Sequence, residues 1–118
     1  MISVSLLRGP DGAILRFEVD GHAGYAKKGE DDIVCAAISA LAYTAVGALE
    51  DLAGVSPDWT ERDGHMECRI PAPGAEPKGD ASSARTILET FALGCRQIEA
   101  SYGTEHVRVT DRAFGNGR

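Results

Sequence analysis

A histidine and a cysteine flank a glycine-rich stretch in the first third of the chain. The histidine is His22 and the cysteine is Cys35, with Gly21, Gly24 and Gly29 beside or between them. A cysteine thiolate is a strong nucleophile, and a neighbouring imidazole can take up its proton and later donate it to a leaving group. The pair therefore predicts nucleophilic catalysis by Cys35 with His22 as its base, provided that the fold brings the two side chains together.

Asp32 stands directly before an apolar helical pattern, and we expect it to be the N-cap of that helix. Cys35 would then lie in the first turn, where unpaired N–H groups and the helix dipole favour the thiolate over the thiol. An aspartate could instead orient the imidazole through its second nitrogen. The residues leave both roles open for Asp32, and Asp31 is the second candidate for either role.

The segments on both sides of Cys35 carry two further candidates. Ser39 lies one helical turn after Cys35, so its hydroxyl either shapes the same pocket or fills a tightly packed position. The charged, glycine-containing loop between His22 and Cys35 suggests a gate that substrate binding orders. An ordinary surface loop has the same composition, so both interpretations remain at this stage.

The pair also has a simpler explanation, which is a core cysteine and an unrelated surface histidine. Cysteine is often buried, and Cys35 has apolar neighbours in Ile33-Val34 and Ala36-Ala37. The other two cysteines, Cys68 and Cys95, fall on apolar stripes of predicted elements, so we expect both to be packed in the core.

The remaining histidines offer little further chemistry. His65 follows Asp63-Gly64 at a predicted hairpin tip and is expected to be exposed, while His106 begins the last predicted strand and is expected to be structural or exposed. A zinc site built from His22, Cys35 and an aspartate would need further ligands, and we find no convincing set. We therefore expect no metal and no other cofactor.

The elements that must position these residues follow from hydrophobic periodicity. Alternating apolar residues predict strands near 2–7, 14–19, 59–62, 65–70 and 105–110, and apolar spacings of three and four predict helices near 33–53 and 82–103. This order predicts an α+β domain, with a largely antiparallel sheet and two helices packed on one face. Alanine occurs on nearly every side of the first helix, so we expect that helix to be closely packed all round.

Length and composition limit the class of protein. With 118 residues we expect a single domain over 1–118, with a frayed tail at about 111–118. The net charge of −6 argues against nucleic-acid binding. We expect no leader and no membrane contact, because no stretch approaches the roughly 20 apolar residues that span a bilayer. Three cysteines without a CxxC pair predict a cytoplasmic protein without disulfides.

The residues around His22 and Cys35 form a more specific pattern than the spacing between these two residues. The segments Gly21-His22-Ala23-Gly24-Tyr25, Asp32-Ile33-Val34-Cys35-Ala36-Ala37 and Ser39-Ala40-Leu41 closely resemble the signature of the bacterial ribosomal-processing cysteine protease family, Prp. The chain length and the order of predicted elements are also similar to that family. The resemblance covers essentially the whole chain, although the specific motifs lie between Gly21 and Leu41.

The resemblance implies a small, homodimeric cysteine endopeptidase. Such enzymes remove an N-terminal extension from a large-subunit ribosomal protein, the twenty-seventh of that series, during ribosome maturation. By resemblance, Cys35 and His22 form the catalytic pair, and Asp32, Ser39 and Gly21 support it. The family's substrate-ordered loop corresponds to 23–31, which includes Ala23, Gly24, Tyr25 and Gly29, and backbone N–H groups at the helix start would form the oxyanion hole. The alternative is a non-catalytic, ribosome-associated module that holds a peptide in the same cleft.

Overall fold

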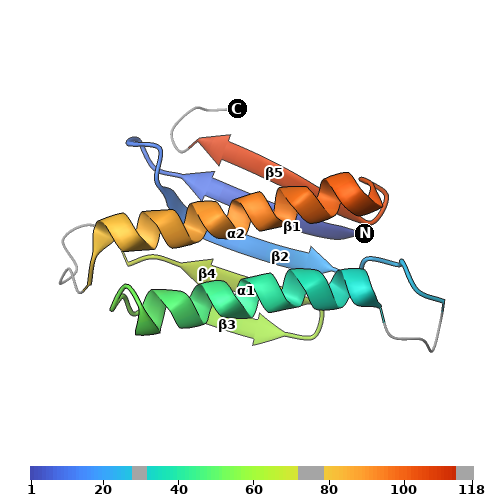
Figure 1. Cartoon of the computed structure of the whole chain (residues 1–118), viewed down its shortest axis with the longest axis horizontal. Coiled ribbons are helices and arrows are strands. Elements are labelled where there is room, and N and C mark those ends of the chain that lie inside the picture. Colours follow the sequence, from blue (N-terminus) through green and yellow to red (C-terminus); the bar gives the residue numbers. More distant parts are fainter. Residues whose placement is uncertain (28–31, 72–78, 114–118) are drawn as a thin grey trace.

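The fold has two layers, a five-stranded sheet and a pair of helices. The computed structural model describes residues 1–27, 32–71 and 79–113. Its elements are β1 (Ile2–Arg8), β2 (Ile14–Gly21), α1 (Ile33–Asp51), β3 (Asp58–Arg62), β4 (His65–Arg69), α2 (Ala81–Tyr102) and β5 (Val107–Ala113). Both helices lie against the same face of the sheet (Figure 1). The predicted element order, the α+β class and the placement of the helices are confirmed.

The strands follow the order β3-β4-β2-β1-β5. β1 with β2, β2 with β4 and β3 with β4 pair antiparallel, as expected for hairpins and their neighbours. β5 pairs with β1 in parallel, because α2 returns the chain across the sheet before β5 begins. The sheet is thus mixed but largely antiparallel, and the first strand lies between the second and the last.

The last strand is longer than predicted. It extends to Ala113, so residues 111–113 pair with the end of β1 instead of fraying. Two arginines hold this end, since Arg8 Nε lies 2.8 Å and Arg96 Nη2 lies 2.6 Å from the carboxylate of Asp111. Sequence periodicity could not predict these ion pairs, which join three separate elements. Residues 114–118 of the predicted tail lie outside the described part of the chain.

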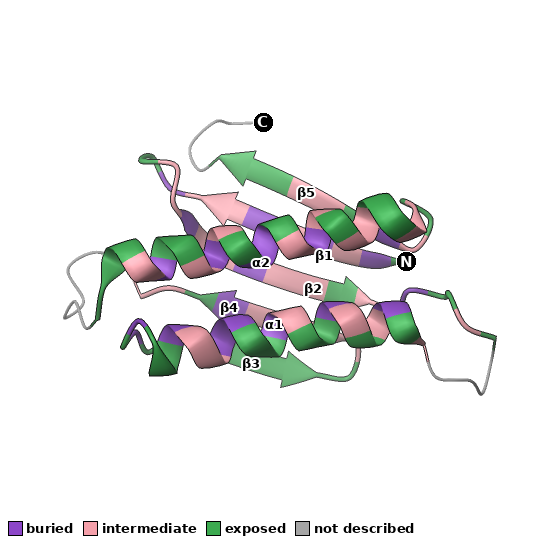
Figure 2. Ribbon diagram, viewed as in Figure 1, coloured by how far each residue is buried: buried purple, intermediate pink, exposed green. Residues whose placement is uncertain are grey.

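The core fills the space between the sheet and the two helices. Figure 2 shows the buried positions on the central strands and on the sides of the helices that face them. At its centre the rings of Phe17 on β2 and Phe91 on α2 lie 4.2 Å apart. Cys68 and Cys95 are 1% and 0% exposed, so their predicted core packing is confirmed.

Helix α1 is packed toward the sheet and toward α2, and the rest of its surface is open. Its buried positions repeat at helical spacing and are Val34, Ile38, Ala42, Ala45, Val46 and Leu49. The expectation of close packing all round is wrong, because Ile33 and Tyr43 on other sides are 55% and 49% exposed. In a two-layer fold each helix meets the sheet on one side and its neighbouring helix on another, so the remaining surface stays open.

By length and composition α1 is also the one described helix that could span a membrane. It has 19 residues, and their most apolar stretch has a mean hydropathy of 1.8. The sequence-based expectation that no stretch comes near this limit was therefore too strict. A helix that forms one layer of a core can have the same length and hydropathy, so these two properties are weak support for a membrane span.

Helix α2 begins at Ala81, one residue before the predicted start near 82. Ser82 and Ser83 are typical capping residues, but the N-cap is Asp80, whose carboxylate accepts hydrogen bonds from the Ser82 amide and the Ser83 hydroxyl at 2.9 Å. Aspartate caps at least as well as serine, and here it engages both serines.

Candidate active site

His22 and Cys35 line one cavity of about 320 Å³. Three parts of the fold enclose it: the end of β2, the first half of α1, and the hairpin between β3 and β4. Ser39, one turn after Cys35, lies on the same wall. The structure thus brings together the two side chains that the sequence proposed as base and nucleophile, with the predicted serine beside them.

Cys35 is the third residue of α1, and its sulfur has a specific donor. The amide of Ala23 donates to Cys35 Sγ at 3.2 Å. Ala23 is 1% exposed, whereas the sulfur side of this contact opens onto the cavity. A hydrogen bond from an N–H group stabilises a thiolate more than a thiol, because the negative charge strengthens the bond.

Asp32 is the N-cap of α1, as predicted, and it also holds the loop in front of the helix. Its Oδ1 accepts the amides of Val34 and Cys35, both at 3.0 Å. Its Oδ2 accepts the amides of Tyr25 at 3.0 Å and Ala26 at 3.4 Å. Both oxygens are therefore occupied by backbone amides, which favours the capping role over the alternative of orienting an imidazole.

These contacts determine the ionisation of Asp32. Partial burial alone would raise the pKa of this carboxyl, but the hydrogen bonds from the Cys35, Tyr25, Ala26 and Val34 amides outweigh it and lower the pKa below its usual value of 3.8. Asp32 is therefore a carboxylate at neutral pH, and its charge is shared among four N–H groups.

Three amides in the first turn of α1 already have acceptors, and the expected oxyanion hole at the helix start stays a prediction. The amides of Val34 and Cys35 donate to the Asp32 carboxylate, and the amide of Ala36 donates to the Asp32 carbonyl. The amide that contacts the sulfur belongs instead to Ala23, in the loop. One oxygen of the cap, Asp32 Oδ1, engages two helix-start donors that the sequence argument had left free.

Gly21 closes strand β2 in a conformation that favours glycine. Its φ is +95°, and a Cβ at this position would lie 2.5 Å from the carbonyl oxygen of Met1. Its own amide donates to the carbonyl of Gly64 at 2.8 Å. Gly21 therefore supports the site by letting the chain turn tightly just before His22.

The β3–β4 hairpin forms a wall of the cavity that the sequence argument treated only as a turn. Gly64, at the turn, faces the imidazole of His22, because a Cβ built on it would lie 3.1 Å from Nε2. His65 lies on the same cavity and is only 25% exposed along its side chain, so the expectation of an exposed residue is wrong. The Asp-Gly hairpin signal predicted the turn, but no local signal placed it against His22.

The described half of the loop, 23–27, contacts the start of β5. His106 Nδ1 lies 3.0 Å from the Ala23 carbonyl, and the ring of Tyr25 packs edge-on against His106 with centroids 5.3 Å apart. Gly24 has a φ of +63°, which lets the chain turn between these contacts. Gly29, the fourth predicted loop residue, lies outside the described residues.

Comparison with known proteins identifies the family. The sequence model of the family described as "Cysteine protease Prp" matches residues 1–107. The chain belongs to this family. The ribosomal processing cysteine protease Prp of Bacillus subtilis is 34% identical over 112 residues, which cover 93% of this chain and 96% of that protein. The predicted resemblance is confirmed, and the protein is a cysteine protease.

Crystal structures of the essential ribosomal processing protease Prp from S. aureus share the fold. The complex with a covalently linked product peptide has a TM-score of 0.79 at 29% identity and covers 95% of this chain and 100% of that chain. The complex with a substrate peptide has a TM-score of 0.78 with the same identity and coverage. Both complexes hold a peptide, which is the class of ligand that a protease cleft takes.

Within this Prp protease the three thiols differ sharply in their surroundings. Burial raises the pKa of Cys68 and of Cys95 to about 12, so both remain protonated at neutral pH. Cys35 is partly exposed and lies on the cavity. Reactivity follows thiolate content and access, so Cys35 is the thiol suited to attack a peptide bond.

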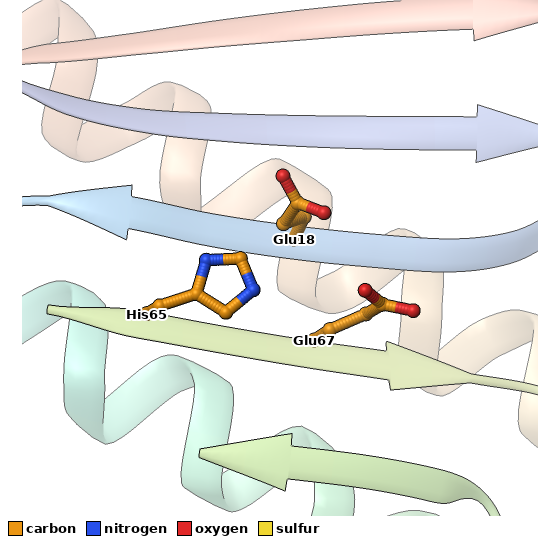
Figure 3. Close-up of side chains that lie close together, drawn as sticks. All are labelled: Glu18, His65 and Glu67. Atoms are coloured by element: carbon orange, nitrogen blue, oxygen red, sulfur yellow. The ribbon is translucent and has the colours of Figure 1, made fainter. Parts of the chain in front are cut away.

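A second group of titratable side chains, which includes His65 of the cavity wall, lies on the side of the sheet away from the helices (Figure 3). Glu18, His65 and Glu67 point toward one another from β2 and β4, with donor atoms within 4.8 Å (Figure 3). Each strand also supplies a partner, since His65 Nδ1 lies 3.2 Å from Asp20 Oδ1 and Arg69 donates to Glu67 at 2.9 Å. His65 and Glu67 thus each have a partner within the sheet, and the expected absence of a metal and of any other cofactor stays a prediction.

Proposed function

We propose that this Prp protease removes the N-terminal extension of a large-subunit ribosomal protein, the twenty-seventh of that series, during ribosome maturation. Cys35 is the nucleophile, His22 is the general base, and Asp32, Ser39 and Gly21 support them. The observation that carries the proposal is the Cys35 sulfur, which accepts the Ala23 amide in the cavity that His22 also lines. The ribosomal processing named for the Bacillus subtilis relative supports the choice of substrate.

The reaction is acyl transfer in two stages. His22 takes the proton of Cys35, and the sulfur bonds to the scissile carbonyl carbon. The C–N bond then breaks as His22 returns the proton to the leaving amine. In the second stage His22 deprotonates a water molecule, which attacks the thioester, and the C–S bond breaks to release thiolate and a new carboxyl terminus. The Ala23 amide stabilises negative charge at the sulfur and at the developing oxyanion beside it.

The charge of the enzyme supports a basic substrate. The chain has a net charge of −6, and Glu61 and Asp63 on the β3–β4 hairpin contribute acidic groups to the cavity wall beside Arg62. An acidic surface attracts a basic chain and accelerates its encounter, and salt screens this attraction. We therefore expect kcat/KM on the extended ribosomal protein to fall as ionic strength rises.

A cleavage assay tests the function directly. The purified chain is incubated with the extended ribosomal protein, and the products are identified by mass spectrometry alongside the Cys35→Ala and His22→Ala variants. We expect one cut at the extension by the wild type and none by either variant, while circular dichroism shows all three folded. A folded wild type that leaves the extension intact would contradict the proposed substrate and favour the non-catalytic peptide-binding alternative.

We propose that the described part of the loop, 23–27, closes on the substrate. The loop lies between the two catalytic side chains and is held by a few hydrogen bonds, to Asp32 and to His106. The bonds from the Tyr25 and Ala26 amides to Asp32 can break and reform as a peptide enters, while the bond to His106 keeps Ala23 in place. Amide exchange at Tyr25 and Ala26 should slow when a substrate peptide is added to the Cys35→Ala variant.

We propose further that the enzyme is a cytoplasmic homodimer. Apolar side chains stay exposed on the two helices, with Ile33 and Leu93 both at 55% and Tyr43 at 49%, and such side chains favour burial by a second copy. Free thiols at all three cysteines suit a reducing compartment. Light scattering should give twice the mass of one chain, and Tyr43→Asp should reduce it to a single chain if this surface is the contact.

A further inference from the structure

We propose that His106 is a positioning residue, which holds the Ala23 amide against the Cys35 sulfur. The inference rests on the proposed function, in which Cys35 is the nucleophile. His106 directly precedes β5, far from Cys35 in sequence, and its imidazole acts through one residue of backbone.

The first link is the bond between His106 and Ala23. The Nδ1 atom of His106 lies 3.0 Å from the Ala23 carbonyl oxygen. A carbonyl oxygen only accepts, so Nδ1 must carry a proton, and this bond fixes the tautomer of a neutral ring. The other ring nitrogen, Nε2, lies 3.7 Å from the exposed carboxylate of Glu105.

The second link is the bond between Ala23 and Cys35. The two peptide groups that flank Ala23 point in different directions, because its N–H faces Cys35 Sγ and its C=O faces His106. The Ala23 side chain between them is buried in the core cluster. Rotation of either peptide group would break a hydrogen bond or expose that methyl group, so holding the carbonyl also holds the amide.

The imidazole is itself firmly held. The backbone of His106 donates to Gly103 at 3.0 Å and accepts the amide of Ile2 at 2.8 Å. Tyr25 packs edge-on against the ring, and Tyr102 packs edge-on against Tyr25 with centroids 5.2 Å apart. His106 can therefore fix Ala23 before any substrate arrives.

The consequence concerns the nucleophile. An N–H donor that is already fixed at the sulfur stabilises the thiolate without any rearrangement of the backbone. A mobile donor stabilises the thiolate less, because it must first be oriented. Among the described residues, the hydrogen bond to the Cys35 sulfur comes from Ala23 and not from His106, so His106 contributes through Ala23.

Two substitutions separate positioning from packing. His106→Asn puts an amide N–H close to the place of Nδ1 and keeps the bond to Ala23, whereas His106→Leu fills similar space without a donor. The readout is the rate at which iodoacetamide alkylates Cys35, measured by peptide mass spectrometry across pH, with Cys68 and Cys95 as internal references. This readout needs no substrate, so it stays informative even if the proposed ribosomal substrate is wrong.

We expect His106→Leu to slow alkylation of Cys35 at pH 7 by about five- to tenfold and to move its pH profile upward, which corresponds to one lost hydrogen bond. On a cleaved peptide the same variant should lower kcat by a similar factor with little change in KM. His106→Asn should restore both values to within about twofold of the wild type, given that the donor is retained. Glu105→Gln, which removes the charge beside the ring but keeps the ring, should match the wild type.

Two results would overturn the proposal. One is a folded His106→Leu whose Cys35 profile and kcat equal those of the wild type. The other is a folded His106→Asn that is as impaired as His106→Leu. If His106→Leu does not fold, His106→Gln serves instead, because its longer side chain carries its N–H near the place of Nε2 and should fail to rescue where asparagine succeeds.

Discussion

The amide of Gly21 donates to the carbonyl of Gly64 at 2.8 Å, which ties the residue before His22 to the turn of the β3–β4 hairpin. The same turn faces the His22 ring closely, since a Cβ built on Gly64 would lie 3.1 Å from Nε2 and the ring would have to shift slightly. The hairpin thus sets both the backbone entry to His22 and the space of its imidazole. The position of the proposed base depends on a segment far from it in sequence.

Gly64→Ala should displace His22. The φ of Gly64 is +71°, and Gly54, outside the cavity, provides a matched control with a φ of +67° and no contact closer than 3.5 Å for an added Cβ. Both alanine variants should lose about 1 kcal/mol of unfolding free energy from the left-handed backbone. Only Gly64→Ala should also lower kcat/KM, by about tenfold, because the imidazole must move. Equal activity of the two variants would contradict this role for the hairpin.

Gly21→Ala should be more damaging than any substitution at a roomy glycine. Its Cβ would lie 2.5 Å from the Met1 carbonyl oxygen, so backbone must shift as well as strain. We expect a loss of about 2–3 kcal/mol in unfolding free energy, measured by urea denaturation, together with loss of activity. Gly47→Ala in α1, where an added Cβ meets nothing within 4 Å, should instead gain about 0.5–1 kcal/mol. A Gly21→Ala variant as stable as the wild type would contradict this prediction, because the backbone at Gly21 and Met1 would then shift at no cost in free energy.

Asp32→Asn should separate helix capping from the hold on the loop. Asparagine still caps a helix but offers one acceptor oxygen and no charge, so the Tyr25 and Ala26 amides lose their partner. At pH 7 we expect about 1 kcal/mol less unfolding free energy than in the wild type, with faster amide exchange at Tyr25.

The pH dependence of this effect has a definite sign. The folded state lowers the pKa of Asp32, so the stability that the carboxylate contributes is present above its usual value of 3.8 and is lost as the pH falls through the lowered value. The difference between wild type and Asp32→Asn should therefore shrink in acid. A difference in unfolding free energy that stays constant from pH 7 to pH 2 would argue against a charge-dependent role.

The three thiols should react at very different rates. Because the pKa of Cys68 and of Cys95 is about 12, only about one in 10⁵ of these thiols is ionised at pH 7. Both side chains are also buried. We expect a thiol probe to label Cys35 at least about 100-fold faster in the folded protein, and all three at similar rates in denaturant. Labelling of Cys68 or Cys95 at the rate of Cys35 under native conditions would contradict the assignment of the nucleophile.

Local signals accounted for the part of the site on α1. Asp32 as the cap, Cys35 in the first turn and Ser39 one turn later all follow from helical spacing within eight residues, and the structure has each at its predicted place. The element order followed equally well, because periodicity of two or close to four is a property of neighbouring residues.

Tertiary contacts decided the rest. Nothing near Gly64 or His106 in the sequence indicates that one faces His22 and the other holds Ala23, because both contacts depend on how strands are ordered in the sheet. The length of β5 depends in the same way on Arg8 and Arg96, which reach Asp111 from two other elements. The exposed side of α1 was misjudged because alanine suits both a buried and an open helix surface.

The parallel pairing of β1 with β5 has a consequence for how the enzyme is made. Ile2 pairs with Val107, so the sheet is complete only when β5 has been synthesised and can pair with β1. Contacts between such distant residues form late, because a long loop must close first. His106 directly precedes this last strand, and its bond to Ala23 is absent until then. While the C-terminal residues of a nascent chain are still in the ribosomal tunnel, the Ala23 amide would not yet be held at the Cys35 sulfur. We therefore expect protease activity to appear only after the chain is released.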